Sequence, residues 1–108
     1  MDADEFARLC RAEKDSMVAA FFDPTAGTAV GSQIDSLGLD DAKLATARSI
    51  VDGALTDALY NFLVALDGGA SLGGVQQTYD LRDESGAKLT GDGSLESAAF
   101  AAFHESDT

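Results

Sequence analysis

The side chains that could do chemistry in this chain are acids, with few nucleophiles or bases beside them. Cys10 is the only cysteine and His104 the only histidine in 108 residues. Their types would allow a nucleophile and base pair, but nothing in the sequence around either residue supports it. A zinc site needs three or four Cys and His ligands, so we expect no zinc chemistry.

Asp57 is the acid with the most suggestive neighbours. On a helix it shares a face with Thr56 and Tyr60, and with Gly53 one turn earlier. A buried carboxylate needs hydrogen bonds or a proton, and the two hydroxyl groups could donate. We interpret this group first as a polar packing network. Contact with a partner or small ligand, or a catalytic role for Asp57, are the alternatives.

The acids of the second half invite a calcium interpretation, but the EF-hand spacing fails. An EF-hand loop needs an acid at position 1, glycine at position 6 and Glu at position 12. Setting Gly86 at position 6 places Leu81 first, and the register on Gly93 fails in the same way. A looser cation site stays open, formed by Asp80, Asp83 and Asp92. Apart from that alternative we predict no metal and no cofactor.

The glycine-rich run 68–74 resembles a phosphate-binding loop in composition only. Phosphate loops follow a strand, open a helix and usually include a lysine. This run follows a predicted helix and has no basic residue. We interpret Gly68 and Gly69 as a helix stop, because glycine adopts the left-handed conformation cheaply, and the rest as a flexible turn.

Asp57 and its neighbours lie on a predicted helix of 27 residues, Asp41 to Asp67. Asp40 can cap the start of this helix. One arc of it is apolar: Leu44, Ala47, Val51, Leu55, Ala58, Leu59, Phe62, Ala65 and Leu66. The opposite arc carries small polar residues: Thr46, Ser49, Gly53, Thr56, Asp57, Tyr60, Val64 and Asp67. A helical glycine costs about 0.5–1 kcal/mol relative to alanine, so we expect a close neighbour on this arc. The predicted partner- or ligand-binding residues are Ser49, Gly53, Thr56, Asp57, Tyr60, Gly68 and Gly69.

The remaining pattern predicts a mostly helical α+β fold in one domain, residues 1–108. Apolar residues recur at helical spacing over residues 3–22, and Pro24 ends that segment. Residues 25–39 form a connector with one helical turn near residues 30–37. Alternation over Val75–Asp83 predicts a strand that pairs with residues 87–90 in an antiparallel hairpin. A last helix over residues 95–104 completes the packing around the central helix.

The net charge of −12 limits the possible partners. Nineteen acids face seven bases, which opposes binding to nucleic acid and anionic membranes and favours basic partners. The same acidity is typical of a solvated surface in a salt-adapted organism, and that alternative stays open. The sequence shows no long apolar run and begins with an acidic segment, so we expect no membrane span and a cytoplasmic location.

Two runs in the second half resemble small uncharacterised bacterial proteins. They are Gly53–Gly69, which ends Leu-Tyr-Asn-Phe-Leu-Val-Ala-Leu-Asp-Gly-Gly, and Tyr79–Leu89, Tyr-Asp-Leu-Arg-Asp-Glu-Ser-Gly-Ala-Lys-Leu. Some proteins of this kind are associated with toxin–immunity or secretion genes. The resemblance implies a compact α+β domain and carries over no functional residue.

We therefore expect a non-catalytic acidic interaction protein, an immunity- or chaperone-like binder of a basic protein. One alternative is a homodimer without another partner, joined through the Gly53 face of the central helix. The other is a small-ligand binder or enzyme that uses Asp57 and Tyr60.

Overall fold

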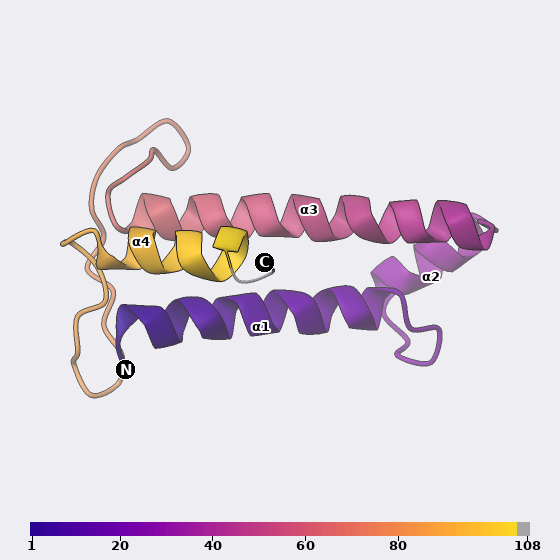
Figure 1. The fold of residues 1–108 in the computed structure, drawn as a ribbon, viewed down its shortest axis with the longest axis horizontal. Helices are drawn as coiled ribbons and strands as arrows, with labels where there is room; N and C mark the ends of the chain where they lie inside the picture. The colour runs from indigo at the N-terminus through magenta and orange to yellow at the C-terminus, as the bar shows by residue number, and fades with distance from the viewer. Residues whose placement is uncertain (106–108) are drawn as a thin grey trace. The chain divides into compact units, whose positions relative to one another are not determined.

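The computed structural model describes residues 1–105, which form four α-helices and one π-helical turn (Figure 1). The elements are α1 (Ala3–Phe21), α2 (Ala29–Ser36), α3 (Asp41–Leu66), α4 (Ser94–Phe100) and the π-helical turn η1 (Ala101–Glu105). Contacts divide the chain into two compact units. Unit 1 combines Met1–Arg11 with the chain from Thr56 onward, and unit 2 is Ala12–Leu55. That the chain forms one domain stays a prediction.

The predicted α+β class is wrong, because residues 1–105 contain helices and no β-strand. Within the expected hairpin the described chain has one isolated bridge, Arg82 to Lys88, and a second isolated bridge, Leu72 to Val75, lies outside the predicted pairing. The Thr90 hydroxyl explains part of the difference. It accepts a hydrogen bond from the Leu81 amide at 3.0 Å and donates to the Tyr79 carbonyl, so a side chain occupies positions that a backbone ladder would need.

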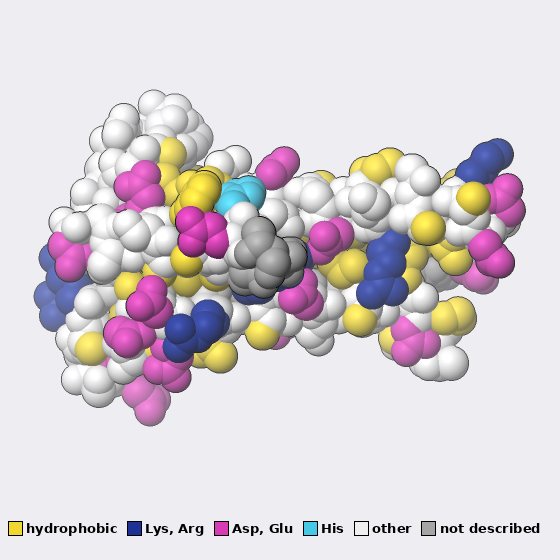
Figure 2. Space-filling model, in the orientation of Figure 1, with side chains coloured by type: hydrophobic (Ala, Val, Ile, Leu, Met, Phe, Trp, Pro, Cys, Tyr) yellow, Lys and Arg dark blue, Asp and Glu magenta, His cyan; other side chains and the backbone are white. Residues whose placement is uncertain are grey.

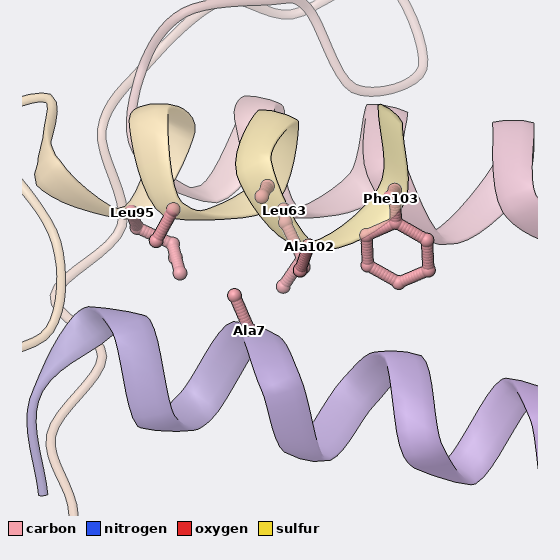
Figure 3. Close-up of a cluster of buried hydrophobic side chains, with 7 residues drawn as sticks. Ala7, Leu63, Leu95, Ala102 and Phe103 are labelled. Carbon is pink, nitrogen blue, oxygen red and sulfur yellow. The ribbon is translucent and has the colours of Figure 1, made fainter. Parts of the chain in front are cut away.

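The hydrophobic core of unit 1 joins the start of α1, the end of α3 and the C-terminal helical segment (Figure 3). Its buried members are Ala7, Leu63, Leu95, Ala98, Ala99, Ala102 and Phe103. Four of the seven are alanines, which let the helix backbones approach closely. Leu95 is the largest side chain that is fully buried among the described residues. The first half of α1 and the predicted last helix therefore do form a core with the central helix.

Helix α3 begins and ends as the sequence predicts. The Asp40 carboxylate accepts a hydrogen bond from the Lys43 amide at 2.8 Å, which caps the first turn. At the other end Gly68 has a φ of 85°. The Gly68 amide donates to the Ala65 carbonyl at 3.0 Å, and the Gly69 amide to the Val64 carbonyl at 2.9 Å. This pair of bonds is the Schellman motif, which supplies donors to carbonyls that the helix leaves unpaired.

Unit 2 has little buried apolar surface. Its buried residues are Lys14 and Val18, and α2 buries no residue at all. The Lys14 ammonium lies 2.6 Å from the Asp52 carboxylate and 2.8 Å from the Asp15 carboxylate. Burial lowers the pKa of Lys14, but the hydrogen bonds to these two carboxylates outweigh burial and raise it overall.

Helical spacing would also allow Arg48 to pair with Asp52, which lies one turn later on α3. Asp52 binds Lys14 instead, and the Arg48 guanidinium lies over the Phe22 ring, 5.9 Å from its centroid. A buried ammonium needs a compensating charge more than an exposed guanidinium does, which favours the long-range pair.

Helix α3 is rich in apolar residues. By length and composition alone it is the one helix among the described residues that is long enough and apolar enough to cross a membrane. This is weak evidence, because helices of water-soluble proteins pass the same test, and the expectation of no membrane partner stays a prediction. Ile50 on this helix is 65% exposed. The apolar surface of α3 is thus only partly covered by the described chain.

Candidate functional site

The predicted site residues of unit 2 lie bare on α3. Ser49 and Gly53 are exposed, and a Cβ atom built on Gly53 would meet no atom within 4 Å. Thr46 on the same arc is also exposed, and its hydroxyl donates to the Ala42 carbonyl of its own helix. No neighbour within the described chain explains the small residues here.

The predicted site residues of α3 in unit 1 separate into different surroundings. Asp57 is exposed and Thr56 is half-buried, and no hydrogen bond joins them in the structure of residues 1–105. Tyr60 packs edge-to-face on His104, with ring centroids 4.5 Å apart, and on Phe100 at 6.4 Å. Tyr60 is thus held by aromatic contacts, not by the expected network around Asp57.

Gly68 and Gly69 have internal neighbours as well as their capping role. A Cβ atom on Gly68 would collide with the Thr78 hydroxyl, and one on Gly69 would lie 2.7 Å from a Glu96 carboxylate oxygen. These two glycines therefore allow the loop and α4 to approach the end of α3. Loop packing accounts for them without a ligand.

The loop after α3 contains a tight turn that the sequence interpretation treated as flexible. Leu72 and Val75 exchange two backbone hydrogen bonds of 2.8 and 3.1 Å around Gly73 and Gly74. The two glycines have φ values of 59° and 85°, as a type I′ turn requires. Leu72 is 39% exposed and Val75 is 57% exposed. We call residues 72–75 the apolar tip; the Gly-Gly pair between two aliphatic residues is the sequence signal that could have predicted it.

The base of this loop is anchored at three points. The Gln76 side-chain amide donates to the Gly68 carbonyl at 3.1 Å, and the Tyr79 amide donates to the Leu66 carbonyl at 3.0 Å. The buried Asp67 carboxylate accepts from the Gly91 amide at 2.5 Å and from the Glu96 amide at 3.0 Å. Figure 1 shows the loop extending away from the end of α3. Hydrogen bonds at both ends of the loop therefore tie the apolar tip to the end of α3.

The acids of the proposed cation site are already paired. The Asp80 carboxylate lies 3.0 Å from the Arg82 guanidinium, and the Asp83 carboxylate lies 3.0 Å from the Met1 amine. Among residues 1–105 no group of three or more His, Cys, Asp and Glu side chains is arranged to hold a metal ion. The structure gives the looser cation site no support.

Asp23, Asp83 and Asp92 share a different arrangement. Each carboxylate accepts a hydrogen bond from the hydroxyl of the Ser or Thr two residues later, at 2.6–2.8 Å. These side-chain bonds, together with bonds from backbone amides, hold the pKa of all three carboxyls below the usual value. For Asp83 the Met1 amine adds to the effect of the Ser85 hydroxyl. The three acids are turn residues in this structure.

The remaining reactive groups are poorly placed for catalysis. Cys10 is half-buried against the core, and burial raises the pKa of its thiol, which lowers the thiolate fraction. A hollow of about 250 Å³ beside α2 in unit 2 is lined by Asp23, Thr28, Asp35 and small residues. It has neither a basic group nor a thiol on its wall, and Asp23 is already bound to Thr25.

Comparison with known proteins finds no match: no family model fits the chain, and no curated protein or solved structure is similar to it. The resemblance of residues 53–69 and 79–89 to small bacterial proteins gains no support from these comparisons. The functional argument therefore depends on the chain's own geometry and charge.

Proposed function

We propose that this chain is a non-catalytic interaction protein that binds a basic protein partner through the apolar tip of unit 1. The proposal is supported by an apolar, uncharged projection on an acidic unit. Residues 68–79 contain no charged side chain, whereas unit 1 as a whole has twelve acids and four bases. Figure 2 shows acidic side chains spread over the viewed face, with fewer basic ones.

The observation that carries the proposal is the exposure of Leu72 and Val75 on a hydrogen-bonded turn. Exposed aliphatic side chains on a preorganised turn lose little conformational freedom on binding, so their burial contributes more of its free energy to affinity. An apolar pocket on the partner would receive the two side chains. The surrounding carboxylates would then meet a basic rim, which speeds association and selects partners by charge.

A catalytic or small-ligand role built on Asp57 and Tyr60 is not favoured by any contact described here. Asp57 is exposed, and Tyr60 is occupied by aromatic packing. An immunity- or chaperone-like role is one form that binding to a basic protein would take.

Comparing the proteins that bind to the wild type and to a tip variant tests the proposal. Immobilised wild-type protein and the Leu72→Asp/Val75→Asp double variant are exposed to native lysate at low salt, and each retained protein is purified and titrated against both. We expect basic proteins that bind the wild type at least tenfold more tightly than the variant and that dissociate as salt rises.

The matched control is Val30→Asp/Leu37→Asp in unit 2, where the same residue types are 39% and 66% exposed. It adds the same two charges to a different surface, so it should bind like the wild type. Retention of neutral or acidic proteins alone contradicts the proposal, as does equal binding by the tip variant. Circular dichroism of both variants checks that the fold survives.

A further inference from the structure

The hollow beside α2 has a wall that suits a cation, and all of its residues belong to unit 2. Its volume is about 250 Å³. The wall carries the Asp23 and Asp35 carboxyl groups and the Thr28 and Ser32 hydroxyl groups, with no basic side chain. These groups accept hydrogen bonds and carry only negative charge. We call this space the acidic hollow.

The size of the acidic hollow limits what it can hold. Gly27 and Gly31 line it without side chains, and a Cβ atom on Gly27 would meet no atom within 4 Å. Its volume of about 250 Å³ is below the roughly 300–1,000 Å³ of pockets that enclose a drug-sized molecule. It equals about eight water molecules at roughly 30 Å³ each. A small molecule or a single side chain therefore fits it.

Both acids keep capacity for a further hydrogen bond. The amide and the hydroxyl of Thr25 both donate to Oδ1 of Asp23, at 2.9 and 2.8 Å. The Oδ2 atom of Asp23 and the Asp35 carboxylate accept no hydrogen bond from residues 1–105. Neither acid forms an ion pair within this part of the chain. Thr25 thus orients one carboxylate without neutralising it.

An apolar hollow adjoins the acidic one, and Pro24, Gly31 and Asp35 line both. The other residues of the apolar hollow are Phe21, Phe22, Ile34 and Leu44. The Arg48 guanidinium lies over the Phe22 ring, and Phe22 lines only the apolar hollow. A ligand with a charged group at one end and a short apolar stem at the other would match the two hollows together.

We propose that the two hollows form one binding site for a small organic cation, an ammonium or guanidinium group on a short apolar stem. The charged group binds at Asp23 and Asp35, because its N–H groups make charge-assisted hydrogen bonds to carboxylates. The stem packs against the side chains of the apolar hollow, where removal of its surface from water adds to the affinity.

Other ligand classes match this site less well. Both acids and the net charge of −12 repel an anion. A calcium ion takes six to eight oxygen ligands and gains nothing from an apolar wall. Residues 1–105 also hold no cluster of three or more His, Cys, Asp and Glu side chains suited to a metal. The site is independent of the apolar tip, which belongs to unit 1, so either proposal can fail without the other.

Nuclear magnetic resonance titration of the full chain with n-butylguanidinium tests the site. We expect saturable shifts of backbone amides that are concentrated in residues 21–35. N-butylurea has nearly the same shape without the charge, so it should bind much more weakly. Shifts that do not saturate or that spread evenly over the acidic surface overturn the proposal, and so does equal binding of N-butylurea.

Isosteric removal of one charge tests the role of Asp35. Asp35→Asn should weaken binding of n-butylguanidinium by about fivefold or more. The matched control is Asp41→Asn, which removes one charge from an exposed acid of unit 2 that lines neither hollow. Screening should keep that effect within about twofold. Equal weakening by both variants would mean that net charge alone attracts the cation, which overturns the site.

Filling the hollow tests its position without changing any charge. Ser32→Leu should weaken binding by about fivefold or more, because the larger side chain occupies the space of the ligand. Ser36→Leu is the matched control, since Ser36 is exposed on the same helix and lines neither hollow. Circular dichroism of all four variants checks the fold. Unchanged binding by a folded Ser32→Leu variant overturns the proposal.

A short peptide of glycine and serine with one central arginine distinguishes the two sources of such a cation. If the peptide shifts the same amides and loses affinity with Asp35→Asn, the site accepts an arginine side chain of another protein. If the peptide fails while n-butylguanidinium binds, the site is reserved for a free small cation. Failure of both ligands overturns the proposal.

Discussion

Asp67 links the end of α3 to the start of α4 through one buried carboxylate. Its oxygens accept hydrogen bonds from the Gly91 and Glu96 amides, 24 and 29 residues away. The N-cap residue of α4 is Gly93, which has no side chain to perform this role. Asp67 therefore supplies from a distance the hydrogen bond that a capping residue usually supplies locally.

Replacing Asp67 by alanine should destabilise the fold by about 2–3 kcal/mol, because two backbone amides lose their acceptor in a partly buried place. Urea unfolding followed by circular dichroism measures the change. Glu84→Ala is the matched control, since Glu84 is exposed in a turn and should change stability by less than about 0.5 kcal/mol. An Asp67→Ala midpoint equal to that of the control would contradict this role.

The sequence could not reveal the long-range partners of single residues. It placed Asp67 on the polar arc of the central helix but gave no sign of its bonds to the next helix. Helical spacing also makes Arg48 a possible local partner of Asp52, whereas Lys14, 38 residues away, is the partner. Helical spacing predicts neighbours on one element, but the need of a buried charge for compensation is decided by packing between elements.

At the scale of elements, two helical glycines have opposite surroundings. A Cβ atom on Gly31 would lie 2.9 Å from the Phe21 carbonyl oxygen and 2.7 Å from the Thr28 hydroxyl oxygen. Gly31→Ala should therefore displace α2 from the end of α1 and lower stability. Gly53→Ala meets open space and should stabilise α3 by about 0.5–1 kcal/mol.

Thermal unfolding of the two alanine variants, at a concentration where the protein is monomeric, compares these effects directly. The chemical change is identical, so opposite shifts in melting temperature report the surroundings alone. Stabilisation by Gly31→Ala would show that α2 is not packed as described, and destabilisation by Gly53→Ala would show that something contacts α3 at that point.

The three Asp turns predict a pH dependence. Because the folded-state pKa of Asp23, Asp83 and Asp92 lies below the unfolded value, their contribution is present above pH of about 4. It is lost as pH falls further through the folded-state values. The urea midpoint should therefore decline as pH falls from about 4 to about 2.5, and replacing all three by Asn should flatten that decline.

A control separates turn chemistry from general charge effects. Asn at Asp35, Asp41 and Asp57 removes the same number of charges from exposed carboxylates that accept no hydrogen bond among the described residues. That variant should keep the steep acid dependence of the wild type. If both triple variants flatten the decline of the urea midpoint equally, net charge and not the turns sets the acid sensitivity of the fold.

The two long helices could be predicted from the sequence because the hydrophobic periodicity agreed with the residues that start and stop a helix. The segments predicted at residues 3–22 and 41–67 correspond closely to α1 and α3, and Asp40 and Gly68 mark the ends of α3 as expected. The hairpin prediction was wrong because alternation over residues 75–83 shows only that this segment could form a strand. A two-stranded hairpin needs a surface to pack on, and Val75 is 57% exposed here. The candidate tip depended on backbone angles at Gly73 and Gly74, which composition alone does not give.

At the scale of the whole molecule, strong acidity accompanies little buried apolar surface. Eleven hydrophobic residues are buried among the described ones, and five of them are alanines. A net charge of −12 repels itself within such a chain and opposes compaction. How strongly the stability of the fold depends on salt therefore distinguishes acidity that serves a partner from acidity that suits an environment rich in salt.

The salt dependence of the isolated protein's stability distinguishes these two explanations of the acidity. Screening shortens the Debye length from about 10 Å at 0.1 M to about 3 Å at 1 M salt, so KCl should stabilise the fold under either explanation. If the acidity serves a basic partner, the protein is already folded at 0.1 M KCl, and we expect a gain of only about 1 kcal/mol, or roughly 4–8 °C, by 1 M. Melting curves across this range, with sucrose at 0.1 M KCl as a control for non-ionic stabilisation, measure the gain. A protein that is unfolded at 0.1 M and folds only near molar KCl would make salt adaptation the cause of the acidity, and the charge-based argument for a basic partner would then lose its support.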